Sequence, residues 1–468
     1  RMVVSPSTRS PIIAMSALAN RVVHSDNSFC PDIRANWTAA FAGFTQACNI
    51  RRAALIYEYD YVGWFEKQKA NVRREITYRL HQGTMESPTL AKTFYRKSFI
   101  KAEKFIKLCG LSLQAFNARF IQGVGNSANH YLGPYIHSMT EPVKASMPHG
   151  YHMASGLSNA EIGSIMSEAW YNGKKSALSI DRKSFDSTVA EQGLVEEANF
   201  YAKISPPNFV QKKTLNAQRH TIGYLRDGTR YEMPGMRKSG DPNTTLGNTL
   251  VAMASTHYTL EHLGIKDATV LAAGDDMLVM YDPSDVPQTG QEIFDAYSLH
   301  QKEKFGFVTT GHFTEDPVQM DFLSCHPLPL VDLSGTTAWV LAPHTGRYVA
   351  KIFATTTLPQ DPAAHAAAVL QGADKVRLSN PLIDGFMARA AALLPAGTVA
   401  SDWVDPDLIY KMQFCEDVVL DIDEADVWLS RRYNGTGLAV LLDHLDKCMT
   451  GFHCALPDGP WSAVFEVD

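Results

Sequence analysis

The chain has 468 residues, of which 45% are hydrophobic and 20% charged, and its formal net charge is −6. It is too long for one ordinary domain and can bury a large core, so two or three interlocked subdomains are expected. No apolar run approaches the roughly 20 residues of a membrane span and no signal peptide is recognisable, which excludes a transmembrane segment within these residues.

Charge is distributed unevenly, and its distribution says more about partners than the net value. Residues 51–130 hold 14 Lys or Arg and 6 Asp or Glu, whereas residues 401–468 hold 4 and 14. A basic portion can line a channel for phosphates while acidic surface elsewhere limits nonspecific binding. The alternative is a pair of solvated faces of opposite sign.

The seven cysteines contain no Cys-x2-Cys pair and are odd in number, which argues against a disulfide framework and favours a reducing compartment such as the cytosol. Cys448, His453 and Cys454 offer a partial zinc site, but without a second ligand pair buried thiols are the better interpretation. The sequence opens on Arg1 and not on Met, which suggests a piece of a longer product.

The first third of the chain carries much of the basic charge. Its first fifty residues are poor in charge and are expected to form an irregular portion that packs across other subdomains. Residues 60–80 follow a helical pattern with interleaved Lys and Arg. The stretches FIKAEKFIKL and FNARFIQG come next, and their cations include Lys101, Lys104 and Arg119.

Local signals predict the elements that follow. SNAEIGSIMSEAWYNG reads as a helix with Ser158 or Asn159 as its N-cap. SALSI then reads as a strand, and Ser187 is expected to cap the next helix. Asp227-Gly228 between two strand-like runs is a hairpin signal.

Two acidic stretches stand where strands are predicted to end. In LSIDRKSFDS, Asp181 follows a strand-like run and Asp186 comes five residues later. In VLAAGDDMLVMY, Asp275 and Asp276 follow Gly274 between two apolar runs, as the tip of a buried hairpin requires. If the strand and the hairpin are neighbours, these carboxylates meet at one sheet end and repel unless cations separate them. Oxygen ligands without a Cys or His cluster favour Mg²⁺ or Mn²⁺, in the layout of a two-metal phosphoryl-transfer site.

Between the acidic stretches, the sequence turns helical from Asn243. Thr244, Asn248 and Ser255 fall on one face of this helix, and apolar residues gather on the other. A merely solvated face would be expected to carry Glu and Lys, and their absence over 243–260 favours contact with a ligand. Beyond the hairpin, EIFDAYSLHQKEKFGF predicts a helix that ends at Gly306, and Ala-rich helices are expected over residues 363–370 and 387–394.

At this point the chain resembles a known family. The order Asp-x4-Asp, Ser-Gly-x3-Thr-x3-Asn and Gly-Asp-Asp is similar to motifs A, B and C of viral RNA-dependent RNA polymerases. The wording Gly-x-Arg-x-Ser-Gly-Asp-x-Asn-Thr resembles tombusvirus-like and related enzymes of positive-strand RNA viruses.

Weaker similarities extend the resemblance over roughly residues 99–353. Lys-x-Glu-Lys followed by Ala-Arg-x-Ile is similar to motif F, and the helix ending at Gly306 is similar in place to motif D. MDFLSC resembles the motif E turn, and GRYVAKIF looks like the opening of the thumb. Gln82-Gly83-Thr84 is a candidate for motif G.

The resemblance implies an α+β protein with the right-hand polymerase fold: fingers, a palm made of an antiparallel sheet with helices, and a mostly helical thumb. The implied divisions are 1–172 for the N-terminal portion and fingers, 173–203 for the first part of the palm, 204–232 for a fingers/palm insertion, 233–334 for the second part of the palm, and 335–468 for the thumb and C-terminal portion.

The resemblance also implies residue roles. Asp181 and Asp275 would bridge two Mg²⁺ or Mn²⁺ ions, Asp276 would assist more weakly, and Lys304 or Lys302 would protonate the leaving pyrophosphate. The residues implied to bind the nucleotide are Lys101, Lys104, Arg119, Asp186, Ser239, Gly240, Thr244 and Asn248.

Asp186 and Asn248 are predicted to reach the same ribose 2′-hydroxyl from different elements. Together they offer acceptors and donors to a group that is itself donor and acceptor. The alternative is that Asp186 only caps the following helix and Asn248 bonds to the backbone.

The expected function is template-directed synthesis of a viral RNA genome, with RNA template, nascent RNA and ribonucleoside triphosphates as ligands. Viral or host replication proteins are expected partners, in the host cytoplasm, within a membrane-associated complex reached through other regions or partners. A reverse transcriptase or DNA polymerase would share the carboxylates, but it would place a bulky apolar or aromatic residue where this chain has Asp186. A noncatalytic RNA-binding scaffold would not need Asp181, Asp275 and Asp276 together.

Overall fold

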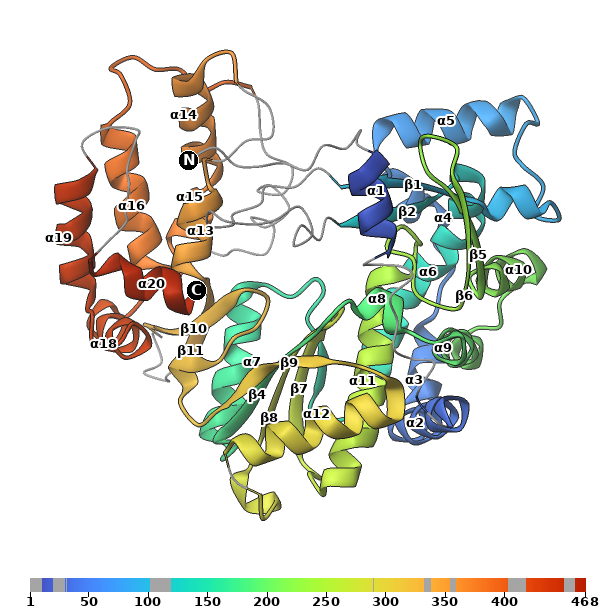
Figure 1. Cartoon of the computed structure of the whole chain (residues 1–468), viewed down its shortest axis with the longest axis horizontal. Coiled ribbons are helices and arrows are strands. Elements are labelled where there is room, and N and C mark those ends of the chain that lie inside the picture. Colours follow the sequence, from blue (N-terminus) through green and yellow to red (C-terminus); the bar gives the residue numbers. More distant parts are fainter. Residues whose placement is uncertain are drawn as a thin grey trace.

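The structure, a computed structural model, contains two β-sheets, a separate β-hairpin and many helices that pack against them (Figure 1). The expected α+β architecture is confirmed in this coarse form. Within the residues that the structure describes, no helix is long and apolar enough to cross a membrane. Those residues are 11–19, 30, 32–101, 119–288, 290–331, 338–353, 359–402, 418–449 and 459–468.

A five-stranded sheet lies at the centre, with strand order β3-β7-β8-β4-β9. Its inner strands are almost wholly buried because other elements cover both faces; β7 and β8 are mainly apolar, whereas β4 also carries serines, Asp181 and Arg182. All neighbours are antiparallel except β3 and β7, so the prediction of an antiparallel sheet is wrong for β3. More than a hundred residues separate β3 from β7, which is ample for the crossover that a parallel pair needs. The strands are Tyr151–Met153 (β3), Ser176–Arg182 (β4), Ala268–Ala273 (β7), Asp276–Tyr281 (β8) and Thr309–Thr314 (β9).

Side chains of β4 alternate between two hydrophobic clusters, one on each face of the sheet. Leu178 belongs to the first cluster and Ala177 to the second. The second cluster joins the sheet to α7 (Asn159–Tyr171) and to the C-terminal helices. The first joins it to α2 (Ile33–Ala47), α6 (Asn126–Ser146), α9 (Glu191–Ile204), α11 (Thr244–Leu263) and α12 (Gln291–Phe305).

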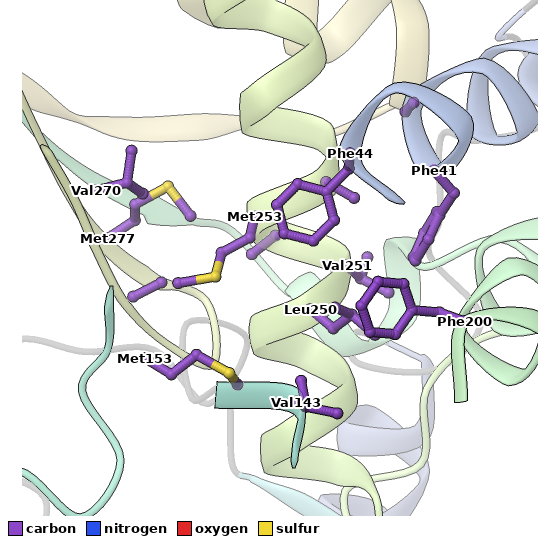
Figure 2. Packing of buried hydrophobic residues seen from close by; sticks show 14 of the residues in the cluster. Phe41, Phe44, Val143, Met153, Phe200, Leu250, Val251, Met253, Val270 and Met277 are labelled. Atoms are coloured by element: carbon purple, nitrogen blue, oxygen red, sulfur yellow. The ribbon is translucent and has the colours of Figure 1, made fainter. Parts of the chain in front are cut away.

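Helix α11 runs through the first cluster and is buried along most of its length. Figure 2 shows its Met253 between Met277 of the sheet and Phe44 of α2. The prediction of a ligand-facing position is wrong for Ser255, which is fully buried and donates its hydroxyl to the Ala252 carbonyl. Contact with the sheet on one side and with α2 on the other leaves only the N-terminal part of α11 for a site.

Residues 33–47 form helix α2, so the expectation of an irregular N-terminal portion is wrong for this segment. Trp37, Phe41 and Phe44 recur at helical spacing and are buried. They pack α2 against α11 and α9, so the expected packing across other parts of the chain is confirmed.

The second sheet has strand order β2-β1-β5-β6 and unites segments from both sides of β4 in the sequence. The Asp227-Gly228 hairpin is confirmed, with Gly228 at φ +90°. Gly223 is required here because a Cβ would lie 2.1 Å from the Tyr231 ring, which crosses it. The strands are Arg96–Ile100 (β1), Phe120–Val124 (β2), His220–Tyr224 (β5) and Arg230–Pro234 (β6).

The capping predictions had opposite outcomes. Ser158 caps α7 in a capping box with Glu161, as expected. Ser187 caps nothing, because it lies inside the short helix α8 (Phe185–Thr188) and donates its hydroxyl to the Ser184 carbonyl. Helix α9 starts later, after Ala190.

The C-terminal helices form a separate group beside the β10–β11 hairpin (Figure 1). The helices expected over residues 363–370 and 387–394 are confirmed as α14 and α16, although α16 starts earlier, and the helix expected over 60–80 is divided into α4 and α5. The remaining bounds are Pro11–Leu18 (α1), Ile50–Ile56 (α3), Tyr61–Glu66 (α4), Ala70–His81 (α5), Phe209–Ala217 (α10), Cys325–Leu330 (β10), Ala338–Pro343 (β11), Thr345–Lys351 (α13), Pro362–Gly372 (α14), Asp374–Arg377 (α15), Pro381–Ala392 (α16), Ile422–Arg432 (α18), Leu438–Cys448 (α19) and Trp461–Val467 (α20).

Gly163 allows α7 to touch the β10–β11 hairpin, since a Cβ there would lie 2.1 Å from the Trp339 carbonyl oxygen. Gly163→Ala is expected to lower the free energy of unfolding by about 1–3 kcal/mol or more, because a strand carbonyl cannot move aside easily. Gly43→Ala is the matched control, since its Cβ would make an ordinary contact at 3.6 Å and Ala favours a helix by up to ~1 kcal/mol. Equal effects of the two changes in denaturant unfolding would contradict this account.

Candidate active site

The predicted acidic stretches meet at one end of the central sheet. Strands β4 and β8 pair with Ile180 opposite Met277, so Asp181 lies next to the tip formed by Gly274 and Asp275. Gly274 has φ +69°, and its N–H donates to the Thr249 hydroxyl of α11 at 2.8 Å. The hairpin tip is therefore anchored to the helix behind it.

Burial and mutual repulsion act on the carboxylates at this tip. Burial first, and then the charges of Asp181 and Asp186, raise the pKa of Asp275. Burial, followed by the charges of Asp275 and Asp181, raises the pKa of Asp276 to about 7. A cation between these groups would relieve the repulsion.

The donor chemistry at this sheet end fits a divalent ion. Asp181, Asp275 and Asp276 offer carboxylate oxygens, as Mg²⁺ and Mn²⁺ prefer. Within the described residues, no three His, Cys, Asp or Glu side chains are grouped closely enough to hold an ion together as they stand. The fit therefore lies in the type of the groups and in their position at one sheet end.

Arg182, which sequence reasoning missed, lies on the opposite face of β4 from Asp181. Its guanidinium is buried against the neighbouring Phe185 and Phe307 rings, 5.6 Å from each centroid. It donates to the Asp275 carbonyl at 3.4 Å, and the charge of Arg182 opposes the rise in the pKa of Asp275. Three further hydrogen bonds tie it to α11 and α12, through Thr256, Tyr297 and Gln301.

Asp186 and Asn248 come together as predicted. The Asn248 side-chain nitrogen donates to Asp186 Oδ1 at 2.7 Å, and its oxygen accepts from Arg237 Nε at 2.8 Å. The alternative in which Asn248 bonds to the backbone is therefore wrong. Arg237, which stands in the quoted Gly-x-Arg-x-Ser-Gly motif but was given no role, forms a buried ion pair with Glu197 of α9, which was not predicted.

The loop before α11 carries the predicted Ser239, Gly240 and Thr244. Ser239 donates to the Phe120 carbonyl at 3.0 Å, and Gly240 bridges to Gly123 of β2. A Cβ on Gly240 would lie 2.6 Å from the Gln122 carbonyl oxygen, so the loop approaches β2 this closely only with glycine. Thr244 closes the loop by donating to the Lys238 and Asp241 carbonyls.

Buried cations also hold this loop. Lys238 donates to the Gly235 and Met236 carbonyls at 2.8 and 2.7 Å, and burial lowers the pKa of its amine to about 7. Asp241 forms a buried ion pair with Arg96 of β1 at 2.7 Å. The loop is thus fixed to the second sheet by charge as well as by backbone contact.

Two of the predicted cations, Lys101 and Arg119, flank the paired ends of β1 and β2. The Lys101 N–H donates to the Arg119 carbonyl at 2.9 Å, so these residues face each other just after β1 and just before β2. The positive charge of Arg119 lowers the pKa of Asp276 against the stronger effect of burial, and that of Arg347 on α13 does the same. Lys104 lies outside the described residues.

Sequence comparison agrees with this geometry. The family model described as "Viral RNA dependent RNA polymerase" matches residues 67–320, more than half of the chain. The chain belongs to this viral polymerase family. The match covers every sequence-predicted site residue, whereas Arg347 falls beyond it.

Individual relatives bear the same description. The RNA-directed RNA polymerase of Turnip crinkle virus is 28% identical over 316 residues, which are 62% of this chain and 38% of that protein. Those of Cymbidium ringspot virus and of Tomato bushy stunt virus (strain Cherry) are each 28% identical over 253 residues, 52% of this chain and 30% of theirs. The matched regions thus make up about a third of these curated relatives.

Lys302 and Lys304, the predicted proton donors, lie in the last turn of α12, which ends at Gly306 as expected for motif D. The Lys304 carbonyl accepts a hydrogen bond from Asn36 of α2 at 3.1 Å. No described contact joins either lysine to the carboxylates, so their role stays a prediction.

The turn expected for motif E is present at residues 320–325. Phe322 and Cys325 exchange backbone hydrogen bonds, with Leu323 and Ser324 at positive φ. Within this segment, Asp321 accepts from His344 and Arg432 at 2.8 and 2.9 Å. Hydrogen bonds to His344, together with Arg432, hold the pKa of Asp321 well below its usual range despite burial.

The raised pKa of Asp276 predicts a pH-dependent stability. Between about pH 4 and 7 the folded state keeps a proton that the unfolded chain has lost, so this group makes folding less favourable as pH rises. Asp276→Asn is therefore expected to raise the melting temperature relative to the parent by an amount that grows from pH 4 to pH 8. Added Mg²⁺ should shrink the gap at pH 8. A gap independent of pH would contradict the assignment.

Proposed function

We propose that this chain performs template-directed RNA synthesis, with an RNA template, a growing RNA strand and ribonucleoside triphosphates as ligands. The observation that carries the proposal is the meeting of Asp181 with the Asp275-Asp276 tip at one sheet end, in a chain of the viral polymerase family. A scaffold that binds RNA without catalysis would have no need for this costly group of carboxylates.

The proposal includes a division into fingers, palm and thumb. The central sheet would be the palm, the second sheet with its helices the fingers, and the helices after β11 the thumb. In support, segments before and after β4 form one sheet, as expected if fingers interrupt the palm on both sides of motif A. Strand β6 continues to Pro234, slightly past the boundary expected at 232.

In the proposed reaction, the 3′-oxygen of the growing RNA bonds to the α-phosphorus of the incoming nucleotide, and the bond from that phosphorus to the pyrophosphate oxygen breaks. Mg²⁺ or Mn²⁺ ions held by Asp181, Asp275 and Asp276 would supply activation of the 3′-hydroxyl and stabilisation of the leaving pyrophosphate. Arg119 and Arg347 would meet the triphosphate, which brings close to four negative charges.

The identity of the sugar would be read where Asp186 and Asn248 meet. Their hydrogen bond at 2.7 Å puts a carboxylate and an amide nitrogen at one point. A 2′-hydroxyl can donate to the first and accept from the second. This polar pair is the feature that favours RNA synthesis over a DNA product, for which a bulky apolar residue would be expected.

Asp275→Asn is expected to remove nearly all nucleotide addition, because it deletes a carboxylate charge while preserving volume. The measurement is Mg²⁺-dependent incorporation of labelled ribonucleotides on an RNA template, with a melting curve to show that the variant is folded. Asp276→Asn should be milder, and Asp267→Asn, an exposed site at the other end of the hairpin, should act like the parent. A folded Asp275→Asn enzyme with a tenth of the parent activity would refute the assignment.

Asp186→Ala and Asn248→Ala are each expected to narrow the preference for rNTP over dNTP, mainly through loss of rNTP efficiency. A site built to bond a hydroxyl can reject the analogue that lacks it by several orders of magnitude. The double variant should lose less rNTP efficiency, expressed as a free energy, than the sum of the two single variants, because Asp186 and Asn248 share one ligand and contact each other. Steady-state kcat/KM for paired rNTP and dNTP substrates measures this, and undiminished discrimination in either variant would remove that residue from sugar reading.

A further inference from the structure

The side chain of Asn248 is held in one of its two amide orientations. Its oxygen accepts from Arg237 Nε at 2.8 Å, and its nitrogen donates to Asp186 Oδ1 at 2.7 Å. A guanidinium can only donate hydrogen bonds, so Arg237 faces the oxygen end and cannot face the nitrogen end. The reversed amide would point its oxygen at the Asp186 carboxylate, where two acceptors oppose each other.

Arg237 is itself fixed by buried partners. It forms an ion pair with Glu197, and the two side chains are only 1% and 2% exposed. Glu197 also accepts from the Tyr201 hydroxyl at 2.9 Å and from the Asn243 amide at 2.7 Å. The backbone N–H of Arg237 donates to the Asp186 carbonyl at 2.8 Å, which ties the same residue to both sides of the site.

Helix α11 makes room for this ion pair with a glycine. A Cβ on Gly247 would lie 2.3 Å from Glu197 Oε1 and 2.7 Å from Arg237 Nη2. The residue next to Gly247 in the helix is Asn248. The ion pair between Arg237 and Glu197 therefore packs against the same helical turn that carries the amide proposed to contact the sugar. A buried ion pair usually stabilises a fold less than apolar packing would. Orienting the neighbouring Asn248 side chain therefore accounts better for the ion pair at this position.

We propose that Arg237 is a positioning residue for sugar selection. Acting through the Asn248 oxygen, it keeps the amide nitrogen beside Asp186, so that one N–H bonds the carboxylate and the other is directed to the ribose 2′-oxygen. Glu197 holds Arg237 in place for this task. The inference rests on the proposed function, because it concerns how that site distinguishes rNTP from dNTP.

Arg237→Lys tests the proposal, since lysine keeps the charge but cannot hold Glu197 and Asn248 with one planar group. We expect the ratio of kcat/KM for rNTP to that for the matching dNTP to fall roughly ten- to a hundredfold, mostly through the rNTP. Arg96→Lys is the matched control, because it alters the other buried ion pair of the same loop without a contact to Asn248. Arg96→Lys should lower kcat/KM for rNTP and for dNTP by the same factor and leave their ratio unchanged.

A second comparison shows whether Arg237 acts through Asn248. In an Asn248→Ala background, adding Arg237→Lys should leave the ratio unchanged, since the amide to be oriented is gone. A further fall there, or a lone Arg237→Lys variant that loses rNTP and dNTP efficiency equally, would overturn the proposal.

If Arg237→Lys does not fold, Glu197→Gln provides the test. It should also lower the ratio of kcat/KM for rNTP to that for dNTP, by a smaller factor. An unchanged ratio in folded Glu197→Gln would overturn the proposal as well. A parent enzyme that adds no ribonucleotide under any divalent ion would instead overturn the proposed function.

Discussion

The constraint on which this structure depends is the crowding of negative charge at one end of the central sheet. Asp275 and Asp276 are buried enough for their pKa values to rise, and Asp181 adds to the repulsion. Two sets of contacts keep these carboxylates together. Strand β4 pairs with both β8 and β9, and the Thr249 hydroxyl of α11 accepts a hydrogen bond from the hairpin tip. Packing of apolar residues behind the tip supplies the energy that the carboxylates cost.

Buried arginines extend this design away from the carboxylates. Arg182 lies against two neighbouring aromatic rings and donates to α11, α12 and the Asp275 carbonyl, so this one side chain links β4 and both helices to the acidic tip. The Arg237 guanidinium likewise links α9 to α11, while its backbone N–H bonds to Asp186 of α8. In both cases the planar guanidinium donates hydrogen bonds to several acceptors at once in a fixed geometry, which the single ammonium group of a lysine cannot do.

The acidic strand and hairpin were predictable because each combines an apolar run with turn chemistry that acts over a few residues. The contact of Asp186 with Asn248 was also predictable, although only from the resemblance to a family. The roles of Arg182 and Arg237 were not, since an arginine in sequence does not reveal its partners, which here lie 11 to 119 residues away. The one available signal for Arg182 was a charge at an otherwise buried strand position. The parallel pairing of β3 depends on tertiary packing, which no local pattern specifies.

The interleaving of the two sheets has a consequence for synthesis on the ribosome. Strand β1 gains its second neighbour only when β5 has been synthesised, more than a hundred residues later. Strand β4 likewise pairs only with strands that follow it, β8 and β9, the second of which ends at Thr314. Pairings this distant in sequence close slowly, and segments that lack their partners expose apolar surface until they do. A nascent chain that ends before β8 cannot assemble the acidic sheet end, because that strand pairs with β4 beside the Asp275-Asp276 tip. The acidic sheet end is therefore completed only after most of both sheets has been synthesised.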